Sequence, residues 1–323
     1  MLAAALSVVS AFAHAEPLLQ RFRVATISAP DLKRVEQDYG RYLDYRVRER
    51  GRIPASLAQS WGAPRMAGRP YVLMSSDAAP DVYVRAVRSP AVAQYRPLTT
   101  WGWNAIEIVV DDTDGTYQRF MTQLPAASAP FKVIGEPANL SGYPSIRAFQ
   151  VEGRSREVLY LTSETGDRSK SPLPPPNGPI GRVFIMVVAG PDVDAMVEWY
   201  ASTFNMVKNP VRQRPVGVLQ RAQRLPPDRA LPLTTLRLAQ QGNLLELDGY
   251  SEVGKPRSAR RGELPPGVAI TTASVRNLDA IDLGKNKTEF IAAPRVQAGL
   301  AYGGRRSATL RGAAGELLEL VEE

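Results

Sequence analysis

The chain has 323 residues, enough for two domains that each bury a sizeable core. Apolar residues make up 44% and charged residues 22%, the composition of an ordinary soluble globular protein, which excludes wholesale disorder. The net charge is +8, but no nucleic-acid-binding motif or aromatic platform accompanies the dispersed arginines, so we expect a solvated basic face and no nucleic-acid partner.

Residues 1–15 resemble an export signal. An apolar run at 2–9 precedes Ala13-His14-Ala15, which has the small-x-small form of a cleavage site, although no basic residue precedes the run. This pattern predicts a periplasmic or secreted protein; the alternative is a frayed apolar tail on a cytoplasmic one. No other apolar run is long enough to span a bilayer.

Histidine and cysteine set the strongest chemical limit. His14 is the only histidine and the chain has no cysteine. If residues 1–15 are removed, the mature protein lacks catalytic triads, thiolate chemistry, the usual zinc sites and the two-His-one-carboxylate iron site. A metal would then need oxygen ligands, which favours Mg, Ca or Mn.

The first half of the chain reads as two units. In the first, a strand at 24–28 leads to a helix capped by Asp31, because Leu32, Val35, Tyr39 and Leu43 share one helical face. A short helix at 55–61 and strands at 71–75 and 82–87 follow. The second unit has a strand at 105–110, a helix at 117–124, and strands at 131–135, 145–152 and 157–162. Residues 164–180 are rich in Pro, Ser and Gly, which predicts a linker.

The pattern restarts after this segment. The third unit has a strand at 183–188, a helix at 193–204, and strands at 234–238 and 244–247. The fourth has a strand at 268–275, a short helix at 278–283, and strands at 289–292, 307–311 and 317–321. Four copies of strand, helix and three strands indicate an α+β protein that arose by duplication. We expect residues 18–163 to form one pair of modules and residues 181–323 the other.

A repeated motif closes the third and fourth units. Residues 242–247 (Gly-Asn-Leu-Leu-Glu-Leu) recur at 315–320 as Gly-Glu-Leu-Leu-Glu-Leu. Each copy places one carboxylate, Glu246 or Glu319, inside an apolar strand. A buried charge needs a partner, so these two residues are the first candidates for a functional site.

With these motifs, and with the helix opening at 192–200 (Asp-Val-Asp-Ala-Met-Val-Glu-Trp-Tyr), the chain resembles the vicinal oxygen chelate superfamily. This group contains glyoxalases, bleomycin-resistance proteins and extradiol dioxygenases. The resemblance covers nearly the whole chain after the leader. It implies βαβββ modules that face each other in pairs, two paired-module domains, and cupped mixed sheets around a ligand.

The resemblance also implies a divalent metal held by His on first strands and Glu on last strands. Carried over, the Glu positions fall on Glu246 and Glu319, whereas the His positions fall near Val183 and Ile270, both apolar. In the first pair, the first-strand positions lie near Val24 and Ala105, and the last-strand positions are Tyr160 and a residue between Tyr83 and Arg85. Half of the metal site is therefore missing. No cofactor is expected, with Mg or Mn bound by Glu246 and Glu319 as the remaining option.

Glu246 and Glu319 are accordingly predicted to be the catalytic residues, one of them as a base with a pKa raised by burial. The alternative is that each pairs with a nearby arginine, with Arg182, Arg237, Arg305 and Arg306 as candidates. Period-two alternation adds three candidate substrate-binding residues on the same strand faces, Thr26, Glu107 and Thr272. Tyr160, at the closing-strand position that the resemblance implies, is the fourth. For Glu107 the alternative is an exposed residue, and for Tyr160 a core residue.

The predicted function is that of a glyoxalase- or dioxygenase-like protein acting on a small organic molecule. The chemistry would be of lyase or isomerase type without a His-ligated metal. The alternative is a non-catalytic protein that binds a small molecule, as resistance members of the superfamily do. A small-molecule ligand is the only partner that the sequence indicates.

Overall fold

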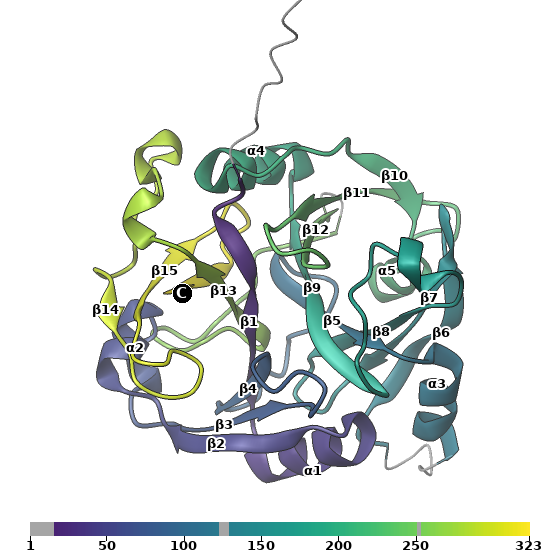
Figure 1. Cartoon of the computed structure of the whole chain (residues 1–323), viewed down its shortest axis with the longest axis horizontal. Helices are drawn as coiled ribbons and strands as arrows, with labels where there is room; N and C mark the ends of the chain where they lie inside the picture. The colour runs from purple at the N-terminus through teal and green to yellow at the C-terminus, as the bar shows by residue number, and fades with distance from the viewer. Residues whose placement is uncertain (1–15, 123–128, 251–252) are drawn as a thin grey trace, which may run out of the picture.

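The computed structural model describes residues 16–122, 129–250 and 253–323. The predicted export signal, residues 1–15, lies outside this part. Within it, no helix is long and apolar enough to cross a membrane. The strands form two eight-stranded mixed sheets, seen side by side in Figure 1, with purple and yellow strands in one and teal and green strands in the other.

Sheet I has the strand order β14-β15-β16-β13-β1-β4-β3-β2. Its strands are β1 (Leu19–Ala29), β2 (Arg46–Arg52), β3 (Pro70–Ser75), β4 (Tyr83–Arg88), β13 (Gly267–Val275), β14 (Arg295–Val296), β15 (Arg306–Arg311) and β16 (Leu317–Glu322). It combines the first unit of the chain with the fourth. The two first strands, β1 and β13, run antiparallel at its centre.

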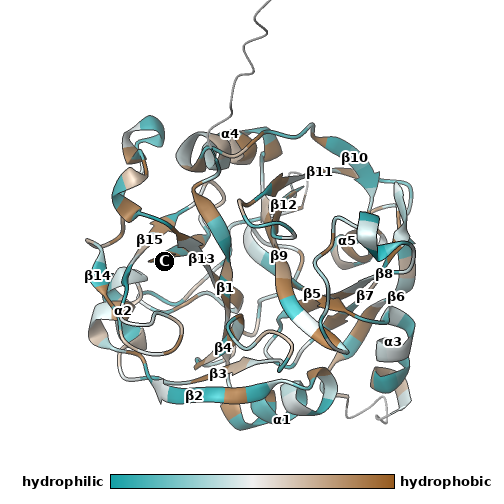
Figure 2. Ribbon diagram, viewed as in Figure 1, coloured by the Kyte–Doolittle hydropathy of each residue, from teal (hydrophilic) through white to brown (hydrophobic). Residues whose placement is uncertain are grey.

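Sheet II has the order β10-β11-β12-β9-β5-β8-β7-β6 and combines the second unit with the third. Its strands are β5 (Gly102–Val110), β6 (Lys132–Leu140), β7 (Tyr143–Glu152), β8 (Val158–Glu164), β9 (Ile180–Gly190), β10 (Arg212–Pro215), β11 (Ala230–Arg237) and β12 (Leu244–Gly249). The central strands β5 and β9 are again antiparallel. The short edge strands β2 and β10 are largely hydrophilic (Figure 2), which discourages pairing with other chains.

The α+β class and the four modules are confirmed, but the expected pairing of the modules is wrong. The expectation joined neighbours in the sequence, first with second and third with fourth. The hydrogen-bonded ladders instead join the first with the fourth and the second with the third. The segment 164–180 therefore connects two modules of one sheet.

The helices are α1 (Leu32–Leu43), α2 (Ala55–Ser60), α3 (Thr113–Thr122), α4 (Val193–Phe204) and α5 (Gly217–Gln223). Short 3-10 turns lie at Pro64–Met66, Arg168–Lys170, Leu278–Ala280 and Leu283–Asn286. The helices predicted at 31–43 and 193–204 are confirmed. The predicted helix at 278–283 is two 3-10 turns, and the strand predicted at 289–292 is wrong. Sequence reasoning did not predict β2, β10 or α5.

Equivalent caps show the duplication at atomic level. The side chain of Asp31 accepts a hydrogen bond from the backbone N–H of Arg34, and that of Asp192 accepts one from Ala195. Both helices end on a residue with φ of 54°, Asp44 and Asn205. Asp and Asn tolerate this left-handed backbone, so each helix stops at a defined residue.

The apolar residues form three clusters. The largest contains outer-face residues of both sheets together with residues of α1 and α4. A second lies on the inner face of sheet I with residues of α2, and a third on the inner face of sheet II with residues of α5. We call these two inner faces cup I and cup II. Trp103 is buried and its Nε1 donates to the carbonyl of Leu317 at 2.7 Å, so this residue packs where the sheets meet.

Two buried tyrosine–glutamate contacts connect the sheets. Tyr39 of α1 donates to Glu157, which precedes β8, at 3.3 Å, and Tyr200 of α4 donates to Glu316, which precedes β16, at 2.6 Å. Both tyrosines lie eight residues after their helix cap, so the contacts are equivalent. The first module thus touches the second, and the third touches the fourth, through helices and hairpin ends rather than through a shared ladder.

Removal of the Tyr200 hydroxyl should therefore destabilise the protein. Tyr200→Phe leaves Oε1 of the buried Glu316 carboxyl without its donor, while Oε2 keeps the backbone N–H of Ala314, and the cost is about 1–3 kcal/mol in the free energy of unfolding. Tyr39→Phe should cost less, because its bond is longer. Urea denaturation measures both, with the exposed Tyr143→Phe as control. Equal losses for Tyr200→Phe and Tyr143→Phe would show that this contact does not join the sheets.

Candidate functional site in cup II

Strand register defines four equivalent pairs of positions, two in each cup. In each module the last strand runs parallel to the first and pairs it in the same register. The matched pairs of first-strand and last-strand residues are Thr26 with Arg85, Glu107 with Tyr160, Val187 with Glu246, and Thr272 with Glu319. The first and last of these pairs belong to cup I, and the middle two to cup II.

Cup I is closed around an internal ion pair. Glu319 has an exposed fraction of 0% and Arg85 one of 2%, and the guanidinium Nη2 lies 3.3 Å from Glu319 Oε2. The Arg85 guanidinium lies 4.6 Å from the centre of the Trp61 ring, a cation–π contact. Three further donors complete the shell of the Glu319 carboxylate: Trp61 Nε1 at 2.7 Å, Tyr302 OH at 2.9 Å and Thr272 Oγ1 at 2.6 Å.

Two further donors of Arg85 are also used within the cup. Its Nε donates to Thr26 Oγ1 at 3.0 Å and its Nη1 to Tyr302 OH at 2.6 Å. Thr26 and Thr272, predicted to bind substrate, are instead parts of this network. Glu319 does pair with an arginine, as the alternative held, but with Arg85 from the other end of the chain and with none of the candidates near it in the sequence.

The expectation that Glu246 and Glu319 share one site is wrong. It followed from the assumed pairing of the third and fourth modules, whereas the ladders place Glu246 in sheet II and Glu319 in sheet I. Two carboxylates in different cups cannot bind one ion or act on one substrate. Glu319 is better described as half of a structural ion pair than as a catalytic base.

Cup II brings together Glu246, Glu107 and Tyr160. Glu107 is buried, with an exposed fraction of 4%, so the exposed alternative for it is wrong. It accepts a hydrogen bond from Thr162 Oγ1 at 2.5 Å. Strand β9 lies between β5 and β12, and Glu107 is in register with Leu244, two residues before Glu246, so the Cα atoms of Glu107 and Glu246 are two strand spacings and two residues apart, roughly 12 Å. Glu246 is partly exposed, and among the described residues no cation forms an ion pair with it.

Two further polar groups of cup II were missed. Asp248 follows Glu246 by two residues on the same strand, and Tyr250 follows by four. Both are buried, and neither Asp248 Oδ1 nor the Tyr250 hydroxyl has a hydrogen-bond partner. A buried polar atom without a partner costs about 1–3 kcal/mol, so these atoms mark a place where a bound group would be stabilising.

The carboxyl groups of cup II have raised pKa values. Burial raises the pKa of Glu107 to about 8, with a smaller contribution from the charge of Glu246. Burial raises the pKa of Glu246 to about 7. Burial and then the charge of Glu246 raise the pKa of Asp248 well above its ordinary value. Groups with such shifts near neutral pH are suited to acid–base chemistry.

These shifts predict that stability falls as the pH rises. A carboxyl whose pKa is higher in the folded state stabilises the fold fully below its unfolded pKa, and this stabilisation is lost as the pH rises through the folded pKa. For Glu107 and Glu246 the window runs from about pH 4.5 to 7–8. Each carboxyl contributes up to about 1.4 kcal/mol per pH unit. Urea midpoints should be lower at pH 8 than at pH 5.5, and Glu107→Gln should reduce that difference. A midpoint that rises over this range would contradict the shifts.

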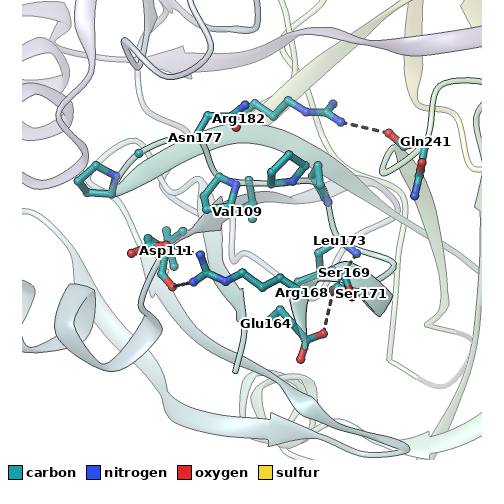
Figure 3. A pocket seen from close by; sticks show the side chains of 16 residues that line it. Val109, Asp111, Glu164, Arg168, Ser169, Ser171, Leu173, Asn177, Arg182 and Gln241 are labelled. Atoms are coloured by element: carbon teal, nitrogen blue, oxygen red, sulfur yellow. Dashed lines mark hydrogen bonds and ion pairs between the residues drawn. The ribbon is translucent and has the colours of Figure 1, made fainter. Parts of the chain in front are cut away.

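A separate cavity of about 820 Å³ lies where the segment 164–180 passes the ends of β5, β8 and β9. Figure 3 shows that its charged groups already have partners: Arg168 binds Asp111, Ser171 binds Glu164, and Arg182 reaches the backbone of Gln241. Val109 lines this cavity and belongs to the apolar cluster of cup II. The cavity therefore adjoins cup II but includes none of the predicted site residues.

The sequence matches no protein-family model and no curated protein. The structure does have solved neighbours. Glyoxalase I from Zea mays superposes with a TM-score of 0.61 at 16% identity, covering 94% of this chain and 92% of that one. A proposed dioxygenase from Bacillus subtilis gives 0.60 at 10% identity, covering 95% and 86%. The chain has the vicinal oxygen chelate fold. At these identities the similarity establishes the fold only, so the chemistry has to be inferred from the residues of the site.

The metal positions of the vicinal oxygen chelate fold carry different residues here. In cup I the Arg85 guanidinium occupies one of them, and a cation there opposes a second cation. In cup II the positions that the resemblance assigns are Ala105 and Tyr160 in one module and, in the other, Glu246 and a cup-facing residue of β9, Ile185 or Val187, so only Glu246 supplies a carboxylate. No three acidic, His or Cys residues in the described ranges converge at metal-binding distance. These donor sets do not fit a resident divalent metal, including an Mg or Mn held by Glu246 and Glu319.

The carry-over to Val183 also failed, for a local reason. Val183 packs in the large outer cluster, whereas Ile185 and Val187 face cup II. The β5–β9 ladder contains register shifts, so counting by twos along β9 does not keep to one face. Arg85 could have been found by the signal that selected the two glutamates, since it too is a charged residue inside an apolar strand, Tyr83–Arg88.

Proposed function

We propose that the protein acts on a small organic molecule bound in cup II, by lyase or isomerase chemistry that begins with proton abstraction next to a carbonyl. Glu246 is the base and Glu107 the acid. The observation that carries this proposal is the contrast between the cups. In cup I the Arg85 guanidinium neutralises the Glu319 carboxylate. In cup II two carboxyls face a common interior, and no cation pairs with them.

The two carboxyls suit different roles because their pKa values differ. Between about pH 7 and 8, more than half of Glu246 is ionised while more than half of Glu107 keeps its proton. Ionised Glu246 takes the proton from the carbon, and the Glu107 O–H donates to the carbonyl oxygen, which gains negative charge as the enolate forms. Return of the proton to another carbon completes an isomerisation, and departure of a group from the β-carbon completes an elimination.

Tyr160 and Thr162 would assist this step without changing their covalent state. Burial raises the pKa of Tyr160 well above its ordinary value, so the phenol stays protonated and can donate to the substrate. Thr162 holds one oxygen of Glu107 in place through its 2.5 Å hydrogen bond. A donor held in position loses little entropy when the substrate binds.

Hydrogen–deuterium exchange tests the proposal without knowledge of the natural substrate. A panel of small carbonyl compounds in D₂O is followed by ¹H NMR with the full chain present. Exchange next to the carbonyl should be accelerated, with a rate that rises with pH through about 7 and falls above about 8. This bell shape follows because the base must be ionised and the acid protonated.

A second candidate function, binding without catalysis, is favoured by the unpartnered Asp248 and Tyr250 atoms, which need a ligand but not a reaction. The exchange experiment separates the two candidates. A compound that binds in cup II with no accelerated exchange at any pH supports the binder and contradicts the enzyme.

A further inference from the structure

The internal duplication supplies a comparison for the ligand of cup II. In cup I the Glu319 carboxylate faces a planar, delocalised cation, the Arg85 guanidinium, which lies on an aromatic ring. Glu246 is the equivalent of Glu319 by strand register. Cup I therefore shows which chemical group this strand position accepts when the chain provides that group itself.

Cup II has the anionic half of this arrangement and lacks the cationic half. The position equivalent to Arg85 is Tyr160, which carries no charge at neutral pH. The carboxyls of Glu107, Glu246 and Asp248 remain close enough that the charge of Glu246 raises the pKa of the other two. Glu107 and Asp248 are buried and Glu246 is partly buried, so an added cation would gain more here than at the surface.

The surroundings do not provide that cation. The charge of Arg257 acts on Tyr250. Its Nε donates to Thr100 Oγ1 at 2.9 Å and its Nη1 to the carbonyl of Val268 at 2.8 Å, while its Nη2 is buried without a hydrogen-bond partner. No ion pair to Glu107, Glu246 or Asp248 forms within the described ranges.

Independent evidence for a missing group comes from the buried polar atoms. Asp248, exposed by 2%, and Tyr250, exposed by 0%, each have an oxygen without a hydrogen-bond partner. Tyr250 belongs to the same apolar cluster as Tyr160, and Asp248 lies between Glu246 and Tyr250 along the chain. An N–H-rich ligand would satisfy both atoms at once, whereas a ligand with only acceptors would leave Asp248, when ionised, unsatisfied.

We infer that cup II binds a small organic cation with a planar amidinium or guanidinium head, which takes the place that the Arg85 side chain fills in cup I. This inference rests on the proposed site and names its substrate class. The head donates to the carboxylates of Glu246 and Glu107 and to Asp248. The apolar part packs on Tyr160, Ile185 and Val187.

Calorimetric titration of the full chain at pH 7.5 tests the sign of the charge. The probes are benzamidine, its neutral isostere benzamide and its anionic counterpart benzoate, with methylguanidine as a smaller cation. We expect a cation to bind at least about tenfold more tightly than benzamide, and benzoate to bind least. Binding should release protons, because the cation lowers the pKa of carboxyls that are partly protonated in the free protein. Proton release appears as a dependence of the binding enthalpy on the buffer.

Two variants locate the effect. Glu246→Gln should weaken cation binding at least about tenfold, whereas Glu136→Gln, an exposed residue of sheet II, should leave it unchanged. Tyr160→Arg introduces an internal cation at the position of Arg85, and it should abolish cation binding and lower the pKa of Glu246. Glu246→Gln remains the decisive variant if Tyr160→Arg does not fold.

The inference is overturned if neither cation binds at millimolar concentration, if benzoate or benzamide binds as tightly as benzamidine, or if Glu246→Gln binds benzamidine like the unmodified chain. Its failure is distinguishable from failure of the proposed function. If neutral carbonyl compounds exchange in a way that requires Glu246 but is not inhibited by benzamidine, the cation proposal is wrong and the proposed enzymatic function stands. If a cation binds tightly but no compound exchanges, the cation proposal stands and the proposed enzymatic function is wrong.

Discussion

Replacement of Arg85 by methionine should destabilise the fold by about 3–5 kcal/mol, the cost expected when a buried ion pair loses one partner. Methionine approximates the length of the arginine stem but leaves the Glu319 carboxylate without a counter-charge at an exposed fraction of 0%. It also removes the cation–π contact with Trp61 and the donors to Thr26 and Tyr302. Urea denaturation at pH 7.5 gives the change in the free energy of unfolding.

The double variant Arg85→Met/Glu319→Gln is the matched control. Neutralising both partners removes the uncompensated charge, so the double variant should be more stable than Arg85→Met alone, and the two effects should be strongly non-additive. Additive losses, or a cost below about 1 kcal/mol for Arg85→Met, would contradict the description of cup I as closed by this pair.

The second large effect is expected at Glu246. Glu246→Gln removes the proposed base while keeping the size of the side chain, so the exchange rate next to the carbonyl should fall by about 10²–10⁴, the usual contribution of general base catalysis. Stability at pH 8 should not fall, because the neutral amide relieves the repulsion that raises the pKa of Glu107 and Asp248. The loss of rate with retained stability distinguishes a catalytic residue from a structural one.

Glu136→Gln on the same sheet serves as control and should exchange at the unmodified rate, since this side chain is exposed. Glu107→Gln should change the pH dependence of the exchange rate. The fall in rate above about pH 8 should disappear, and the maximal rate should be much lower. A Glu246→Gln protein that retains full exchange activity would remove Glu246 from the mechanism.

Local chemistry made much of the fold predictable from the sequence. The caps at Asp31 and Asp192 begin the two long helices where the sequence places them. Alternation along the strands placed Thr26, Glu107 and Thr272 on inner faces, and the structure confirms all three. The recurring order of strand, helix and three strands identified the fourfold repeat. Each of these signals depends only on neighbours within one element.

The pairing of strands and side chains that are distant in the sequence was not predictable in this way. Nothing within a module determines which other module its first strand will pair with, and the assumption that sequence neighbours pair assigned Glu246 and Glu319 to one site. The partner of Glu319 is Arg85, more than two hundred residues away, so a search for a nearby arginine could not find it. The register shift in the β5–β9 ladder likewise depends on two strands together.

The missed cup II residues have a simpler cause. Asp248 lies two residues beyond Glu246, so the alternation that placed Glu107 on an inner face would also have placed Asp248 beside Glu246. The repeated motif ends at Leu247 and so does not include Asp248. Tyr250 lies at the next inward position and is fully buried. The acidic character of cup II follows from these residues together.

The central claim is that burial raises the pKa values of the cup II carboxyls towards neutral pH, and that no cation pairs with these carboxyls. Carboxyl ¹³C NMR titration of the glutamate-labelled chain tests it most directly, with the signals assigned by their absence in Glu246→Gln and Glu107→Gln. We predict midpoints near 7 for Glu246 and near 8 for Glu107. Midpoints near the ordinary glutamate value of 4.5 for both would show that cup II is neutralised or solvated like a surface, and would contradict the claim.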